Sequence, residues 1–293
     1  ASSTNVMGPY EPCPYNPILT HRFMQKSVML RKLGHADLVQ TPKGDWWMVF
    51  LGVRYTTNEK PFMGRETYLV PANWEGIYPV GNPGYGIVQF TYPLPPGVEF
   101  YDRKNVFIDE FDSPVLDRSW TFLRSENDFA KVNKGMLEIN LKKAGLRSLS
   151  SPSFIGRRIE SASFEVIVEL LLKQLQMNEN AGITLFANNR NHVRIDFDGL
   201  SLKLIEVWDG ELVMIKDSPV ESENVKIKIR SIDEVFSIFY FNGREWVLFA
   251  ENLRMLSLNK YRYTGAFIGL YGSSNGRKPK GKLLVNRFEY RNR

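Results

Sequence analysis

The sequence predicts an all-β fold, and three observations support this expectation. Several segments alternate apolar and polar residues with the period of two that is typical of half-buried strands, namely residues 164–170, 192–197, 225–230 and 283–288. Asn242-Gly243, a strong hairpin signal, lies between the strand-like residues 235–241 and 245–250. The chain is rich in Gly, Pro and aromatic residues, and no long helical period is present.

The length of 293 residues predicts two core-forming units. Pro93, Pro95, Pro96 and Gly97 interrupt the strand pattern, and residues 101–105 are polar. We therefore place a boundary there, with one unit at residues 1–105 and a second at 106–293. Many strands at short spacing, with turn residues between them, predict a β-sandwich for the second unit.

A hairpin opens the informative part of the first unit. Residues 37–41 and 46–53 are rich in branched and aromatic side chains, and Pro42-Lys43-Gly44-Asp45 supplies turn chemistry between them. His35 and Asp37 occupy alternate positions, so both point to one face if the strand extends back to them. A histidine beside a strand commonly has a purely structural role, and that interpretation stays open.

The surrounding motifs resemble the late blades of glycoside hydrolase family 43, in particular its β-xylosidases and α-L-arabinofuranosidases. The resemblance covers nearly the whole chain, in the family order. The matching segments are residues 8–11, 16–20, 34–53, 63–71, 74–75, 109–113, 120–124, 151–158 and 264–269.

The resemblance implies part of a five-bladed β-propeller followed by a jelly-roll sandwich similar to concanavalin-like lectin domains. It also implies three catalytic carboxylates, an Asp base, an orienting Asp and a Glu acid, on the first three blades. Those blades precede Gly8 in the family order. We therefore expect this chain to be the C-terminal portion of a longer enzyme, through a split gene, proteolytic nicking or a partial sequence, and to carry no catalytic carboxylate itself.

Two residues of the blade are predicted to face the sugar. The resemblance implies that His35 lies near the propeller axis, where it helps to hold a calcium ion through water and borders the substrate. It implies that Arg65 reaches the sugar at the nonreducing end. A guanidinium group is always charged and presents a rigid fork of donors to sugar hydroxyls. The alternative role for Arg65 is an ordinary surface salt bridge. Calcium prefers oxygen ligands, so water must fill most of the shell.

An inverting glycosidase needs an acid and a base roughly 6.5–9.5 Å apart. Asp37 and Glu66 are the acidic residues of the blade motifs considered for this pair, but we expect Glu66 to fix the adjacent Arg65 rather than to take part in catalysis. The predicted function is the C-terminal portion of an inverting exo-glycosidase for β-1,4-xylosides, α-L-arabinofuranosides or both. The alternative is a noncatalytic carbohydrate-binding β-sandwich protein.

The second unit offers two further alternatives. Phe164, Phe197, Phe236 and Phe267 are candidate platforms for sugar rings, although strand phenylalanines more commonly belong to the core. The acids at 109, 110 and 112 would suit a second calcium ion. In a strand, however, they do not all share one face, and a solvated strand edge is equally compatible.

Charge and cysteine content restrict the partners. The net charge is +6, but basic residues are scattered apart from the run at 277–282, which we expect to be a solubilising loop rather than a nucleic-acid surface. Cys13 is the single cysteine, which excludes an intrachain disulfide. We expect no membrane partner, a cytoplasmic location, an oligomer, an N-terminal propeller polypeptide as partner, and a xylo-oligosaccharide or arabinoside as substrate.

Overall fold

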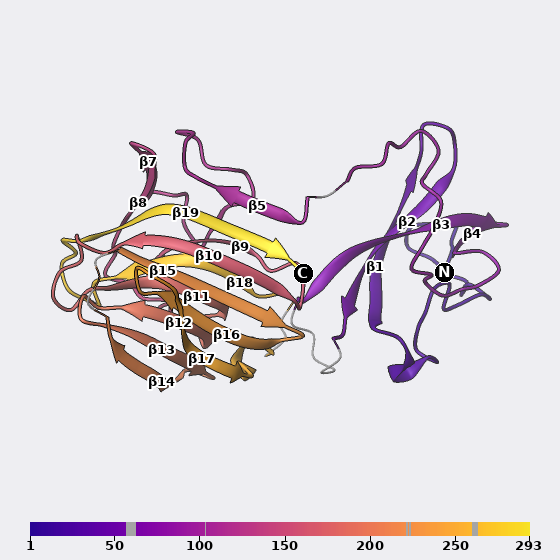
Figure 1. Ribbon diagram of the computed structural model, residues 1–293. Helices are drawn as coiled ribbons and strands as arrows, with labels where there is room; N and C mark the ends of the chain where they lie inside the picture. Colours follow the sequence, from indigo (N-terminus) through magenta and orange to yellow (C-terminus); the bar gives the residue numbers. More distant parts are fainter. Residues whose placement is uncertain (57–62, 103, 221, 223, 260–262) are drawn as a thin grey trace. The chain divides into compact units, whose positions relative to one another are not determined.

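The computed structural model divides into two compact units, Ala1–Arg103 and Lys104–Arg293. It describes residues 1–56, 63–102, 104–220, 222, 224–259 and 263–293. The chain is all-β, as predicted, and Figure 1 shows strands in both units. The described residues include two short 3-10 helices, η1 (Gln25–Ser27) and η2 (Leu256–Asn259). In the part of the chain that the structure describes, no helix is long and apolar enough to cross a membrane.

The first unit contains a four-stranded antiparallel sheet in which consecutive strands are neighbours. Its strands are β1 (Leu30–Gln40), β2 (Trp46–Arg54), β3 (Arg65–Glu75) and β4 (Tyr78–Gly81). The predicted hairpin is confirmed, and the turn between β1 and β2 has Gly44 at a φ of +94°, a conformation that glycine adopts at little cost. The first strand begins earlier than predicted, at Leu30.

One face of this sheet carries the core of the first unit. Leu30, Met48, Phe50 and Val70 are buried together with Val88 from a later segment. Gly52 makes this packing possible, because a Cβ atom at that position would lie 2.6 Å from Cδ1 of Leu30. The β1–β2 pair is therefore held together on this face by side chains that require a glycine between them.

The second unit is a sandwich of two antiparallel sheets. The larger sheet has eight strands in the order β17-β16-β15-β10-β19-β8-β7, with β5 also paired to β19. Its strands are β5 (Val106–Asp109), β7 (Ala130–Asn133), β8 (Met136–Asn140), β10 (Phe164–Leu171), β15 (Asn224–Ile232), β16 (Val235–Phe241), β17 (Trp246–Leu253) and β19 (Lys282–Asn292).

The smaller sheet has seven strands in the order β14-β13-β12-β11-β18-β9-β6. Its strands are β6 (Thr121–Phe122), β9 (Ser153–Arg158), β11 (Asn180–Asn188), β12 (Asn191–Phe197), β13 (Ser201–Trp208), β14 (Glu211–Pro219) and β18 (Phe267–Ser273).

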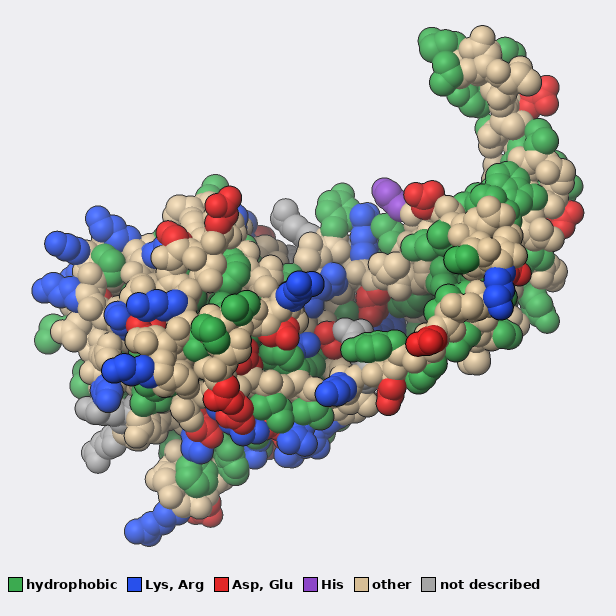
Figure 2. All heavy atoms as spheres, turned by 90° about the horizontal axis from the view of Figure 1, so that it is seen from above, with side chains coloured by type: hydrophobic (Ala, Val, Ile, Leu, Met, Phe, Trp, Pro, Cys, Tyr) green, Lys and Arg blue, Asp and Glu red, His purple; other side chains and the backbone are tan. Residues whose placement is uncertain are grey.

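Aromatic and branched side chains fill the space inside the sandwich. Phe164, Phe197 and Phe236 are buried, as the core interpretation of these residues predicted, whereas Phe267 is half-buried. The ring of Phe288 lies 4.8 Å from that of Trp120 in an edge-to-face contact. The predicted Asn242-Gly243 hairpin joins β16 to β17. The basic run at 277–282 is mostly in the connection between β18 and β19, and Figure 2 shows Lys and Arg interspersed with Asp and Glu over the sandwich.

Candidate functional site

Arg65 is the first residue of β3 and lies in a row of three paired residues across the sheet. Val53 of β2 pairs with Arg31 on one side and with Arg65 on the other. Residues that pair directly share a face, so the two arginines flank the buried Val53 on one face. The Arg31 guanidinium donates to the carbonyl oxygens of Val28, at 2.9 Å, and Lys26, at 3.0 Å. The row is a half-buried cationic strip at the end of the sheet.

Glu66 lies on the opposite face and has a different arginine as its partner. The Arg54 guanidinium donates from Nη2 to Oε1 of Glu66, at 2.7 Å, and from Nε to Oε2, at 3.0 Å. The Tyr68 hydroxyl donates to the same carboxylate at 3.2 Å. The expectation that Glu66 fixes Arg65 thus overlooked Arg54, which binds this carboxylate through two hydrogen bonds. Adjacent strand residues point to opposite faces, so the diagonal neighbour on β2 is the better placed arginine.

The Arg54–Glu66 pair alters the acidity of its neighbours. Burial raises the pKa of the Tyr68 phenol above its ordinary value, and the negative charge of Glu66 raises it further. Burial by itself lowers the pKa of the Arg54 guanidinium, but the hydrogen bond and charge of Glu66 outweigh this effect and raise it overall. This face of the four-stranded sheet, called the blade from here on, therefore holds a fixed ion pair beside a neutral phenol.

His35 lies at a bulge in β1, which breaks the simple alternation expected around it. The register shifts between Gly34, which pairs with Leu51, and Asp37, which pairs with Val49, so two residues of β1 oppose Phe50. His35 has a φ of +49° and is exposed. A bulge bends the strand and redirects side chains. A shared face for His35 and Asp37 therefore no longer follows from their spacing.

Asp37 and Glu66 do not meet. Asp37 pairs with Val49, which pairs with Leu69 of β3, whereas Glu66 pairs with Gly52. Odd and even positions of β2 face opposite sides of the sheet, so the two carboxylates lie on opposite faces. They cannot act as an acid and a base on one glycosidic bond. This agrees with the prediction that neither residue is catalytic.

A metal ligand was predicted at His35, and a second calcium site was one of two interpretations of the acids at 109, 110 and 112. Among the described residues, no group of three or more His, Cys, Asp or Glu side chains is placed to hold a metal ion. Asp109 instead accepts a hydrogen bond from the Trp120 indole at 2.7 Å, and Glu110 pairs with Arg287. His35 offers one imidazole nitrogen rather than a cage of oxygen atoms, so water would have to fill most of the shell of a calcium ion held there.

A polar cluster in the sandwich was missed by the sequence pattern. Asp196 and Arg194 of β12 lie on the face of the strand that was expected to be polar and solvated, yet the Asp196 side chain is only 4% exposed and that of Arg194 only 13%. Asn180 of β11 donates to Oδ2 of Asp196 at 2.8 Å. Burial raises the pKa of Asp196 to about 6. The signal available in the sequence was an acid and a base at alternate positions of one strand.

Comparison with protein families identifies the chain. Residues 108–291 match the model of the β-xylosidase C-terminal concanavalin A-like domain, and residues 1–78 match that of glycosyl hydrolases family 43. The chain belongs to glycoside hydrolase family 43. Both His35 and Arg65 lie inside the segment that matches the hydrolase model, and the sandwich cluster lies inside the concanavalin A-like match.

Individual relatives agree with this assignment. A xylosidase/arabinosidase of Butyrivibrio fibrisolvens is 32% identical over 92% of this chain and 54% of its own length. A non-reducing end α-L-arabinofuranosidase of Bacteroides ovatus is 29% identical over 99% of this chain and 56% of its own length. The chain thus spans about half the length of these curated relatives.

Solved structures show the same fold. The family 43 protein GH43B from a xyloglucan locus of Bacteroides ovatus superposes with a TM-score of 0.87 at 27% identity, over 99% of this chain and 60% of its own. A xylan β-1,4-xylosidase of Bacillus halodurans gives a TM-score of 0.87 at 25% identity, over 99% of this chain and 59% of its own. The four-stranded sheet and the sandwich of this chain therefore both have counterparts in family 43 enzymes.

Proposed function

We propose that this family 43 chain forms the C-terminal portion of an inverting exo-glycosidase that removes β-1,4-xylosyl residues, α-L-arabinofuranosyl residues or both from xylo-oligosaccharides. The observation that carries the proposal is the position of Arg65 at the end of β3, beside Val53 and Arg31 and on the opposite face from the Arg54–Glu66 pair. The names of the relatives support the substrate class, since they include xylosidases and arabinosidases.

In this proposal Arg65 binds and orients the sugar. Its permanently charged fork donates hydrogen bonds to sugar hydroxyls, and its charge favours the ionised form of a nearby carboxylate. In this proposal the acid and base come from further propeller sequence, as the resemblance to the family implies, and Asp37 and Glu66, which lie on opposite faces of the sheet, do not form the pair. His35, at the exposed bulge of β1, borders the same region. There the imidazole of His35 would help to hold a calcium ion through water, and the ion would supply a fixed positive charge.

The test is substitution of Arg65 in the active enzyme that contains this chain. We expect Arg65→Ala to lower kcat/KM on 4-nitrophenyl β-D-xylopyranoside or α-L-arabinofuranoside by about 100-fold or more, because an orienting, charge-stabilising contact is lost. Arg65→Lys should restore part of the rate by keeping the charge without the fork. Arg22→Ala, which removes an exposed arginine of the same unit, is the matched control. Unchanged kinetics in Arg65→Ala would remove this residue from the site.

The noncatalytic alternative makes a different prediction. A carbohydrate-binding sandwich without an enzymatic role would bind saccharides while no preparation of the natural protein hydrolysed them. Binding and hydrolysis must therefore be measured separately on the same preparation.

A further inference from the structure

The edge strand β14 of the smaller sheet exposes an uninterrupted run of apolar side chains. Leu212, Val213, Met214 and Ile215 are 44%, 52%, 46% and 38% exposed. A strand with one buried face alternates between covered and exposed side chains, so four exposed apolar residues in succession indicate a functional surface rather than an ordinary solvated strand. An exposed apolar patch of this kind is typical of a surface that another polypeptide covers.

The backbone of β14 is open on one side as well. The strand pairs with β13, and among the described residues no strand pairs with its other side. An edge strand presents a row of unpaired backbone N–H and C=O groups, which is a template for a further strand. Proteins commonly protect such edges by keeping them short or charged. The edge strand at the opposite end of this sheet, β6, has only two residues, whereas β14 has nine, and residues 212–215 carry no charge.

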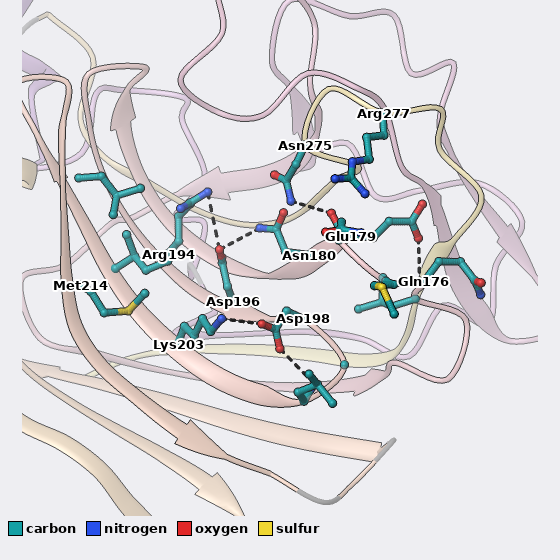
Figure 3. A pocket seen from close by; sticks show the side chains of 17 residues that line it. Gln176, Glu179, Asn180, Arg194, Asp196, Asp198, Lys203, Met214, Asn275 and Arg277 are labelled. Carbon is teal, nitrogen blue, oxygen red and sulfur yellow. Dashed lines mark hydrogen bonds and ion pairs between the residues drawn. The ribbon is translucent and has the colours of Figure 1, made fainter.

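The apolar surface continues from β14 onto the face of the smaller sheet. Leu212 and Met214 line a cavity of about 760 Å³ on this face together with Met177 and Leu200. Met177 and Leu200 come from two connections and are 89% and 79% exposed. Figure 3 shows Met214 next to Lys203 of β13 on the same face. A polypeptide that pairs with β14 would therefore also meet apolar side chains beside the strand.

The register with β13 shows which side chains share the other face of β14. Glu211 and Val213 lie two positions apart and therefore point the same way. The register shifts between Met214 and Lys216, so Ile215 is an extra residue in a bulge. Because of this extra residue, Lys216 lies on the face of Val213 and Glu211 rather than on the face of Met214. The charges of Glu211 and Lys216 thus flank the apolar run on one face.

A second copy of β14, antiparallel to the first, matches this pattern. A twofold axis through one residue places residues at equal distances from the axis opposite each other, and each contact occurs twice. With Val213 on the axis, Leu212 lies opposite Met214 of the second copy, and these two side chains share a face. One position further, with the bulge allowed for, Glu211 lies opposite Lys216 of the second copy.

The charges favour this register over its neighbours. Opposite charges directly across an antiparallel pair stabilise it, and like charges destabilise it. An axis through Leu212 would place Glu211 opposite Val213 and leave Lys216 beyond the paired residues. Both charged side chains are exposed, and the ammonium group of Lys216 lies 5.3 Å from the centre of the Phe249 ring, on the side of the larger sheet. The apolar run and the two charges are therefore complementary to a second copy of the same strand.

We propose that β14 is a self-association surface through which two copies of this chain pair antiparallel. Val213 lies on the twofold axis, and Glu211 of each copy contacts Lys216 of the other. The pairing joins the two smaller sheets into one continuous sheet, satisfies the backbone groups of both edge strands and covers residues 212–215. It gives the oligomer expected from the sequence a defined interface.

The first experiment counts the copies of this chain in the enzyme that contains it, by native mass spectrometry and sedimentation velocity. We expect an even number of copies. Val213→Lys places two ammonium groups together at the axis, so we expect the dissociation constant to rise about 100-fold and the number of copies to halve. The matched control is Leu248→Lys, because Leu248 is 43% exposed on the other long edge strand, β17, and it should leave the number unchanged.

Two results of this experiment would overturn the proposal. One is a parent enzyme with a single copy of this chain at concentrations up to about 100 μM, including a single copy bound through β14 to a different protein. The other is an unchanged number of copies in Val213→Lys. The readout is stoichiometry rather than hydrolysis, so this proposal and the proposed glycosidase can fail separately.

The second experiment exchanges the charges. Glu211→Lys and Lys216→Glu each replace two opposite-charge contacts by two like-charge contacts, so we expect either variant alone to dimerise about 10-fold more weakly. An equal mixture of the two variants restores opposite charges at both contacts, so a mixed dimer should form with nearly the parent affinity. Its mass identifies it, and its formation shows that both variants fold. A mixture that associates no better than the separate variants would refute pairing in this register.

Discussion

The two units of the chain differ in how their sheets are covered. In Lys104–Arg293 two sheets enclose a core that contains Phe164, Phe236 and Phe288. In Ala1–Arg103 a single sheet has a core on one face, while its other face presents apolar side chains such as Val39 and Leu69, which are exposed. The sandwich thus encloses its core between two sheets, although its edge strand β14 also exposes apolar side chains such as Leu212 and Met214. Because most of the buried apolar side chains belong to the sandwich, we expect this unit to be the more stable of the two.

The largest expected effect comes from a core substitution in the sandwich. Phe288→Ala should lower the free energy of unfolding of this unit by about 3–5 kcal/mol, since it removes a ring packed against Trp120 and Phe107. Phe50→Ala in the blade should leave the sandwich transition within about 0.5 kcal/mol of the parent. Hydrogen exchange with mass spectrometry, read peptide by peptide, separates the two units. Equal loss of protection in the sandwich for both variants would contradict independent cores.

The next largest effect concerns the pH dependence of stability. It comes from two buried titratable side chains of β12, Asp196 and His192, which set this strand apart from the strands of the first unit. Burial raises the pKa of Asp196 to about 6, from 3.8, and lowers that of His192 to about 4, from 6.5. The contribution of Asp196 to stability is therefore full below pH 3.8 and lost as the pH rises through 6. That of His192 is full above pH 6.5 and lost as the pH falls through 4.

These opposite slopes nearly cancel in the parent, and single substitutions should reveal each one. Relative to the parent, Asp196→Asn should gain roughly 3 kcal/mol in unfolding free energy between pH 4 and pH 7. His192→Gln should lose a similar amount, roughly 3 kcal/mol, over the same interval. Urea unfolding at several pH values measures both, and each variant serves as the control for the other. Slopes of the same sign would show that burial does not govern these two groups.

The smallest effect concerns the ion pair of the blade. Glu66→Gln should cost only about 1 kcal/mol of unfolding free energy, because the side chains of Arg54 and Glu66 remain 39% and 25% exposed and solvent screens their attraction. It should also lower the pKa of Tyr68, which the Glu66 charge helps to raise. Ultraviolet titration of the phenol tests this, with the exposed Glu75→Gln on β3 as control. An unaltered Tyr68 titration would show that Glu66 does not act on the phenol.

Local features of the fold could be predicted from the sequence because their causes are local. The branched and aromatic run that forms β2 and the Asn242-Gly243 turn depend on residues adjacent in the chain. The bulge at His35 could not be predicted, because a positive φ at a residue other than glycine leaves no mark in the pattern. The bulge changes what the spacing of His35 and Asp37 implies.

The polar cluster around Asp196 in the sandwich shows a second kind of limit. Alternation correctly places His192, Arg194 and Asp196 on one face of β12, but it does not indicate whether other elements cover that face. Asn180 of β11 and Tyr271 of β18, which are hydrogen-bonded to each other beside Asp196, come from distant parts of the sequence. Similarly, the partner of Glu66 is Arg54 on the adjacent strand rather than the neighbouring Arg65. Pairing between strands had to be known before either feature became visible.

The central claim is that this chain works as part of a glycosidase, and the most direct test is made on protein purified from its natural source. The measurement combines hydrolysis of 4-nitrophenyl β-D-xylopyranoside and α-L-arabinofuranoside with intact masses under native and denaturing conditions. We predict release of nitrophenol by material in which this sequence accompanies further propeller polypeptide. A stable species of 33.8 kDa that has no partner and hydrolyses neither glycoside would contradict the claim.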